Sequence, residues 1–112
     1  MDKREAVRVP VRVRAQCRAD QIVIDGTVED ISRSGVFFTA PAITRSLNPG
    51  STTQIKLDLP GEPTLHLSAE VVRVVRVDHQ PRVGMALKFT SEAERASRRP
   101  LVNFIMRAHA VH

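Results

Sequence analysis

Apolar and polar residues alternate along most of this chain, and a period of two permits few structures other than β-strands. In the first run the apolar residues occupy every second position: Val9, Val11, Val13, Ala15 and Cys17. The polar residues Arg12, Arg14, Gln16 and Arg18 alternate with them. Successive side chains of a strand point to opposite faces of a sheet, so this run predicts a strand with one face in the core and one in water.

Five further strand-like runs follow, most of them with the same alternation. They lie near residues 22–28, 36–38, 55–59, 65–77 and 83–89, with turn sequences such as Asn48-Pro49-Gly50 between some of them. The alternation slips at Val71-Val72, which predicts a β-bulge or a change of face. No helical crossover separates the runs, so a parallel sheet is disfavoured. The sequence thus predicts an all-β fold, a six-stranded antiparallel β-barrel over residues 9–90.

The C-terminal segment changes to a helical period. Ser91, followed three residues later by Glu94, resembles a capping box and predicts a helix start. Apolar residues then recur on one helical face: Leu101, Phe104, Ile105 and Ala108. Pro100 should kink this segment or divide it into two short helices. We expect a C-terminal α-helical segment over residues 91–109 that lies on the barrel.

Length and composition favour one small domain. A chain of 112 residues holds one core and leaves little for a second module, so residues 1–112 are expected to form a single domain. No apolar run approaches the roughly 20 residues that cross a bilayer, and the first residues lack the apolar centre of a signal peptide. These features predict a cytoplasmic protein without membrane insertion.

Catalysis and metal binding are not expected. Cys17 is the only cysteine, so no intrachain disulfide or thiolate cluster can form, and its place in an alternating run predicts a small core residue. The four histidines have no metal-ligand spacing. Ser32 has no histidine near it in the sequence that could act as a base. We therefore expect no enzyme, no metal site and no cofactor.

The net charge of +5 favours an anionic partner, and two motifs are candidates to bind one. Arg4 and Arg8 lie four residues apart in a lead-in before the first strand. The same spacing recurs elsewhere in this basic chain, but Arg12, Arg14 and Arg18 alternate along a strand as its solvated face. Only the first pair lies where a loop could fold over a ligand. Guanidinium groups bond phosphate bidentately and stack on aromatic planes.

The second motif is Asp30-Ile31-Ser32-Arg33-Ser34-Gly35, which ends one strand run and opens the next. At positions i and i+2 of a strand, Asp30 and Ser32 would share a face, and a carboxylate can accept hydrogen bonds from guanine. Gly35 permits a turn or a close backbone approach that a Cβ would obstruct. The structural alternative is a tight turn in which Asp30 and Ser32 bond local backbone.

In this order along the chain, these features resemble the PilZ domain family, whose motifs are RxxxR and (D/N)xSxxG. The run Arg82-Val83-Gly84-Met85-Ala86-Leu87-Lys88-Phe89 is similar to the last strand of the family, and the resemblance covers residues 3–107. It implies a six-stranded barrel that binds the bacterial second messenger cyclic di-GMP. By position, Arg4 and Arg8 would grip phosphates and stack on or bond guanine. Asp30 and Ser32 would read a guanine edge, and Gly35 would let the backbone fit.

Two residues are candidates for additional ligand contacts, Lys3 and Arg33. A basic residue directly before the first motif arginine tends in this family to accompany a stacked ligand dimer, and Lys3 holds that position. Lysine lacks the planar fork of the usual arginine, so the resemblance leaves open whether one ligand or a stacked pair binds.

The predicted function is a receptor for cyclic di-GMP that signals to an unidentified protein effector. Binding would order the arginine segment at residues 1–8, in a chain that is a monomer or homodimer. A second hypothesis is a nucleotide-independent PilZ-like adaptor that acts by protein–protein contact, for instance in pilus or motility machinery. A third, a basic barrel that binds RNA or DNA through Arg12, Arg14 and Arg18, is disfavoured because only four aromatic residues could stack on bases.

Overall fold

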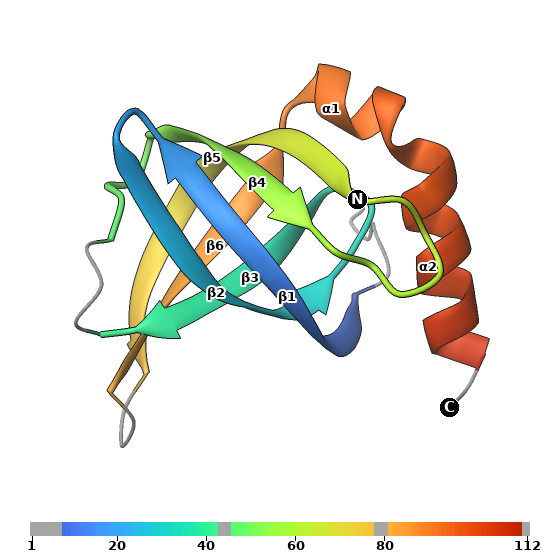
Figure 1. The fold of residues 1–112 in the computed structure, drawn as a ribbon, viewed down its shortest axis with the longest axis horizontal. Coiled ribbons are helices and arrows are strands. Elements are labelled where there is room, and N and C mark those ends of the chain that lie inside the picture. The colour runs from blue at the N-terminus through green and yellow to red at the C-terminus, as the bar shows by residue number, and fades with distance from the viewer. Residues whose placement is uncertain (1–7, 43–45, 78–80, 111–112) are drawn as a thin grey trace, which may run out of the picture.

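The computed structural model describes residues 8–42, 46–77 and 81–110 and shows six strands followed by two helices (Figure 1). The strands are β1 (Val9–Ala19), β2 (Ile22–Ile31), β3 (Gly35–Pro41), β4 (Thr52–Leu57), β5 (Leu65–Val77) and β6 (Arg82–Phe89). The helices are α1 (Ser91–Ala96) and α2 (Arg98–Ala110). The order of elements follows the changes of period in the sequence.

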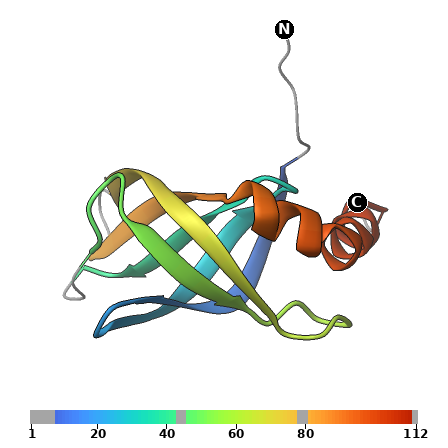
Figure 2. The same ribbon diagram turned by 90° about the horizontal axis from the view of Figure 1, so that it is seen from above.

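The strands pair antiparallel and close into a barrel in the order β1-β2-β3-β6-β5-β4 (Figure 2). This confirms the predicted six-stranded antiparallel barrel. The closing seam is short, because in the described residues β1 pairs with β4 only over Ala15–Arg18. β3 pairs with β6, although β4 and β5 lie between these two strands in the chain. That pairing places the turn between β2 and β3 beside the end of β6.

The alternating apolar residues form the core, as predicted. The buried apolar residues of β1 are Val9, Val13, Ala15 and Cys17, and those of β6 are Val83, Met85, Leu87 and Phe89. The slip predicted at Val71-Val72 is confirmed as a bulge, because the register between β5 and β6 shifts between Val71 and Arg73. Val71 is buried, whereas Val72 is 55% exposed.

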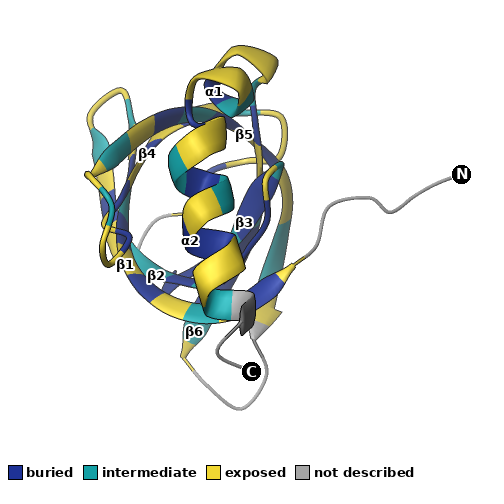
Figure 3. Cartoon of the chain, turned by 90° about the vertical axis from the view of Figure 1, so that its right-hand side faces the viewer, coloured by how far each residue is buried: buried dark blue, intermediate teal, exposed yellow. Residues whose placement is uncertain are grey.

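The two helices lie over one end of the barrel (Figure 3). The apolar face of α2 is buried there through Leu101, Phe104 and Ile105. Arg107 fastens this helix to the turn between β4 and β5, donating hydrogen bonds to Glu62 Oε2 at 2.7 Å and to the Pro60 carbonyl oxygen at 3.0 Å. No helix in the described ranges is long and apolar enough to cross a membrane.

The helical segment differs from the sequence prediction in two details. Thr90 is the N-cap of α1, and its Oγ1 accepts from the Ala93 N–H at 3.2 Å, so the cap lies one residue before the predicted Ser91. The break between the helices lies at Ser97, not at Pro100. Pro100 lies in the first turn of α2, where a backbone N–H has no partner within the helix and its loss is tolerated.

Cys17 is a core residue, as its place in the alternation predicts, and it is 1% exposed. Burial raises the pKa of the Cys17 thiol to about 12, because a thiolate would lose its hydration, while a hydrogen bond with Thr53 acts in the opposite direction. The pKa in the folded chain lies above the ordinary thiol value. The neutral thiol therefore contributes stability below about pH 9, and this contribution is lost as the pH rises toward 12.

We expect the native protein to resist thiol-specific reagents. At pH 8, labelling of Cys17 should be roughly a hundredfold slower in buffer than in denaturing urea, because attack requires a thiolate that the folded core excludes. The absorbance of the released thionitrobenzoate measures both rates. Equal rates in the two conditions would show that Cys17 is accessible in solution.

Candidate functional site

The turn between β2 and β3 is held by Ser32. Its hydroxyl oxygen accepts from the backbone N–H groups of Ser34 and Gly35, both at 3.2 Å, and the residue is 1% exposed. The Ser32 N–H also donates to the Gly35 carbonyl oxygen at 2.9 Å. The shared strand face expected for Asp30 and Ser32 is therefore wrong: β2 ends at Ile31, and Ser32 turns inward to bond local backbone. Asp30 stays half-buried on the strand.

Gly35 lies where two backbones approach closely. A Cβ atom at this position would overlap the carbonyl oxygen of Leu87 and would stand 3.2 Å from the Cα of Lys88. The Phe89 N–H donates to the Ser34 carbonyl oxygen at 2.8 Å, which also holds the turn against β6. The close approach expected at Gly35 is confirmed, and its cause is the pairing of β3 with β6.

An ion pair joins the two sequence motifs. Arg8 Nη1 donates to Asp30 Oδ1 at 2.5 Å. The register of β1 against β2 explains the contact, because Pro10 pairs with Asp30 and Arg8 directly precedes β1. The side chains remain 60% and 31% exposed, so the pair contributes at most about 1 kcal/mol to stability. Its importance is that it brings a cation and a carboxylate from distant parts of the sequence to one place.

A cleft of about 270 Å³ opens beside this ion pair. Its lining comes from the residue before β1 and from β3, β5, β6 and the turn, and comprises Arg8, Ser34, Gly35, Val72, Arg73, Ala86, Leu87 and Lys88. The charged residues in this lining, Arg8, Arg73 and Lys88, are all basic. Gly35 and Ala86 are the small residues of this lining. Its chemistry suits an anion that also carries a flat or apolar part.

The structure brings together only some of the predicted site residues. Arg8 and Gly35 line the cleft. Asp30 does not line it but forms the ion pair with Arg8. Ser32 is buried behind it, and Arg33 is exposed in the turn without lining the cleft. Lys3 and Arg4 lie outside the described residues. Among those described, no group of three His, Cys, Asp or Glu side chains could hold a metal ion.

Sequence reasoning missed the contribution of β5 and β6 to the cleft. Val72, Arg73 and Lys88 belong to neither motif. One signal was present, because the slip in alternation at Val71-Val72 predicts that a residue of β5 leaves the regular pattern. Which strand lies beside that bulge depends on the order of strands around the barrel. A local sequence pattern does not indicate this order.

Several solved structures share this fold, although their sequences have low identity to this chain. The inhibitor of motility MotI/DgrA from Bacillus subtilis has a TM-score of 0.75 at 19% identity, over 96% of this chain and 52% of that one. The PilZ domain of YcgR from Escherichia coli with c-di-GMP has a TM-score of 0.67 at 17% identity, over 97% and 96%. The MrkH–c-di-GMP complex from K. pneumonia has a TM-score of 0.76 at 17% identity, over 100% and 57%.

These comparisons differ in how much of each relative they cover. The chain spans about half the length of the motility inhibitor and of MrkH, and nearly all of the YcgR domain. No curated protein sequence is detectably similar to it. The model of the PilZ domain family, however, matches residues 2–107. That match covers both motifs, the whole barrel and most of α2, and so the chain belongs to the PilZ domain family.

Proposed function

We propose that this domain is a receptor for cyclic di-GMP. The observation that carries the proposal is the Arg8–Asp30 ion pair, which joins the two motifs beside a basic cleft with Gly35 in its wall. The ligand of the YcgR and MrkH structures supports the choice of this anion. The proposal gives the domain a role in ligand binding, in keeping with its membership of the PilZ domain family.

The two members of the ion pair would take different parts of the ligand. Arg8 bonds Asp30 through one guanidinium nitrogen, which leaves further N–H donors for a phosphate. Asp30 would be repelled by a phosphate, so its role is to accept N–H groups from the edge of guanine, using the Oδ2 that Arg8 does not occupy. Ser32 and Gly35 would serve the site by fixing the turn that presents Asp30.

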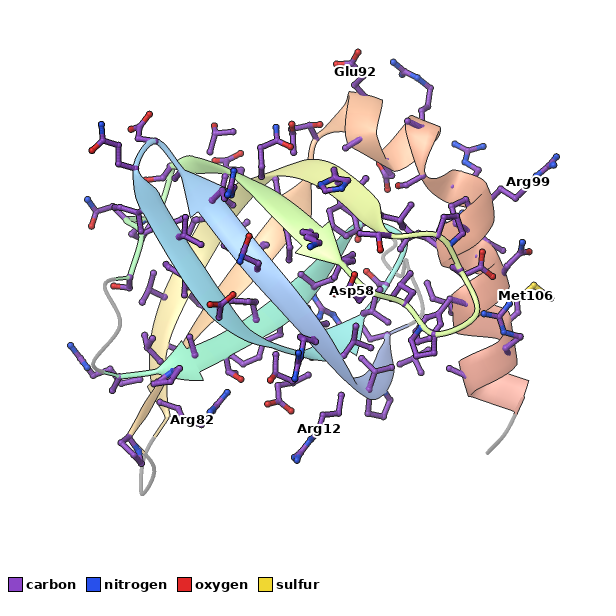
Figure 4. The ribbon with its side chains drawn as sticks, in the orientation of Figure 1. Arg12, Asp58, Arg82, Glu92, Arg99 and Met106 are labelled. Atoms are coloured by element: carbon purple, nitrogen blue, oxygen red, sulfur yellow. The ribbon has the colours of Figure 1, made fainter. Side chains whose placement is uncertain are left out.

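We further propose that the signal passes through the segment that contains Arg4 and Arg8. A bound anion would hold this segment against the barrel, a transition from a loose to an ordered state. α2 packs against β1, the strand that follows this segment in the chain. The outer side of α2 exposes Arg99 and Met106, which point away from the barrel (Figure 4), and Met106 is 64% exposed. A protein effector would contact the segment and this helix together.

Isothermal titration calorimetry with cyclic di-GMP tests the proposal, with GTP and cyclic di-AMP as comparison ligands. Saturable heat with cyclic di-GMP alone would support the receptor, and the stoichiometry would distinguish one ligand from a stacked pair. The absence of heat at millimolar ligand would reject it. The nucleotide-independent adaptor would then be the better assignment.

The carboxylate of Asp30 should determine which base is accepted. We expect Asp30→Ala to weaken binding of cyclic di-GMP by roughly ten- to a hundredfold, because a hydrogen bond to a charged group is lost. Weak binding of cyclic di-AMP should not change, since adenine does not present the same N–H edge. Asp25→Ala is the matched control, because Asp25 is an exposed carboxylate of the same strand that bonds Gln16. Equal losses for both cyclic dinucleotides would contradict a role in base recognition.

A further inference from the structure

We propose that Arg73 and Lys88 form a second anion-binding wall of the cleft, and that a cyclic dinucleotide lies across the strands between this wall and Arg8. The inference rests on the proposed function and extends it to residues outside the two motifs. It assigns the second phosphate of the ligand to β5 and β6, whereas the motifs supply contacts from the lead-in, β2 and β3.

The strand order places positive charge at both ends of the cleft. Arg8 is tied to β2 through Asp30, Gly35 begins β3, and Lys88 on β6 pairs with Gly35. Arg73 on β5 pairs with Ala86 of β6. The order β2-β3-β6-β5 therefore spans three strand spacings, about 14 Å in all at roughly 4.8 Å each. A ligand with two separated phosphates can reach a cation at each end.

The bulge in β5 is what directs Arg73 into the cleft. In a regular strand, residues 71 and 73 would share a face, and Val71 is fully buried. The additional residue, Val72, shifts the register, so that Arg73 pairs with Ala86 and is exposed. Without the bulge this arginine would face the core. Bulges interrupt pairing and are used to redirect a side chain, and here the redirected side chain is a cation beside the motif glycine.

Arg73 and Lys88 are exposed and line the cleft. In the described ranges the ion pairs are Arg8–Asp30 and Arg107–Glu62, so neither Arg73 nor Lys88 takes part in one there. Between the cations, Gly35, Ala86 and Val72 give a surface of small and apolar groups. Such a surface accepts a flat base, while cations at its rim hold the phosphates. Val72, which is 55% exposed, is the large apolar side chain of this surface.

Calorimetric titrations of Arg73→Gln, Lys88→Gln and the double variant with cyclic di-GMP test the inference. Arg76→Gln and Lys56→Gln are matched controls, because both are exposed on β5 and β4 and neither lines the cleft. We expect Arg73→Gln to weaken binding roughly tenfold or more, Lys88→Gln less, and the controls not at all. The double variant should also show a weaker dependence of affinity on salt, because fewer charges attract the ligand.

The outcomes separate this inference from the proposed function. If the unchanged chain binds cyclic di-GMP and the double variant binds equally well, the second wall is refuted while the receptor stands. Equal losses in the double variant and in both controls would likewise refute it, because the effect would then be one of net charge. If the unchanged chain shows no binding, both proposals fail. All variants should melt within about 2 °C of the unchanged chain, since the replaced side chains are exposed.

Discussion

Arg8→Ala should lower the affinity for cyclic di-GMP by at least about a hundredfold while leaving the barrel folded. The variant removes the guanidinium that is proposed to bind phosphate and also the group that pairs with Asp30, and each charge-assisted contact is worth roughly 1.5–3 kcal/mol. Stability should change by no more than about 1 kcal/mol, because the ion pair is exposed to solvent. Titration calorimetry gives the affinity, and thermal melting followed by circular dichroism gives the stability.

Arg14→Ala is the control for this result. Arg14 is an exposed arginine of β1 that does not line the cleft, so its loss reduces the net charge by the same amount. The Arg14→Ala variant should bind cyclic di-GMP with the same affinity as the unchanged chain. Undiminished binding in the Arg8→Ala variant would place the ligand elsewhere on the barrel, and the site described above would have to be abandoned.

Gly35→Ala should destabilise the protein more than any exposed substitution, by roughly 2–4 kcal/mol. The added Cβ would overlap the Leu87 carbonyl oxygen, which belongs to the backbone and cannot rotate away as a flexible side chain can. β3 and β6 must separate to make room, and both the core and the wall of the cleft lie at that pairing. We expect a melting temperature lower by roughly 10 °C or more, together with loss of cyclic di-GMP binding.

Gly50→Ala distinguishes a steric cause from a conformational one. Gly50 has a φ of +91°, but a Cβ there would meet no atom within 4 Å. Its replacement should cost only about 1 kcal/mol, the strain of a positive φ in a residue with a side chain. If Gly35→Ala proved no more harmful than Gly50→Ala, the close approach of β3 and β6 would not be a constraint in solution.

The fold could be predicted from sequence because one signal, the alternation of apolar and polar residues, repeats in most of the strands. The alternation around Val13 and Met85 identifies the core face directly, and even the slip at Val71-Val72 has a structural counterpart. One detail that failed depends on which of two neighbouring residues caps a helix. Thr90 and Ser91 both carry a hydroxyl suited to an N-cap, and the end of β6 at Phe89 favours the first of them.

The site was harder to predict because it depends on where a strand stops and on which strands meet. Asp30 and Ser32 would share a face only if β2 continued past Ile31, and the turn that ends it takes the Ser32 hydroxyl inward. Arg73 and Lys88 reach the cleft through pairings between strands that are far apart in the chain. Such pairings arise from packing the whole barrel, so the motifs alone define only one side of the cleft.

The short seam between β1 and β4 bears on how the domain could respond without losing its structure. Ala15–Arg18 closes the barrel, whereas the first half of β1 has β2 as its one strand neighbour in the described residues. Pro10 lies in that half and has no N–H to offer to an added strand. Arg8, the proposed ligand-binding arginine, thus directly precedes a stretch of β1 that has one strand neighbour. Val9 and Val13 are buried in the core, so this stretch is held by side-chain packing where a second ladder is missing. A displacement confined to Arg8 would leave that packing in place, because the arginine lies outside the strand.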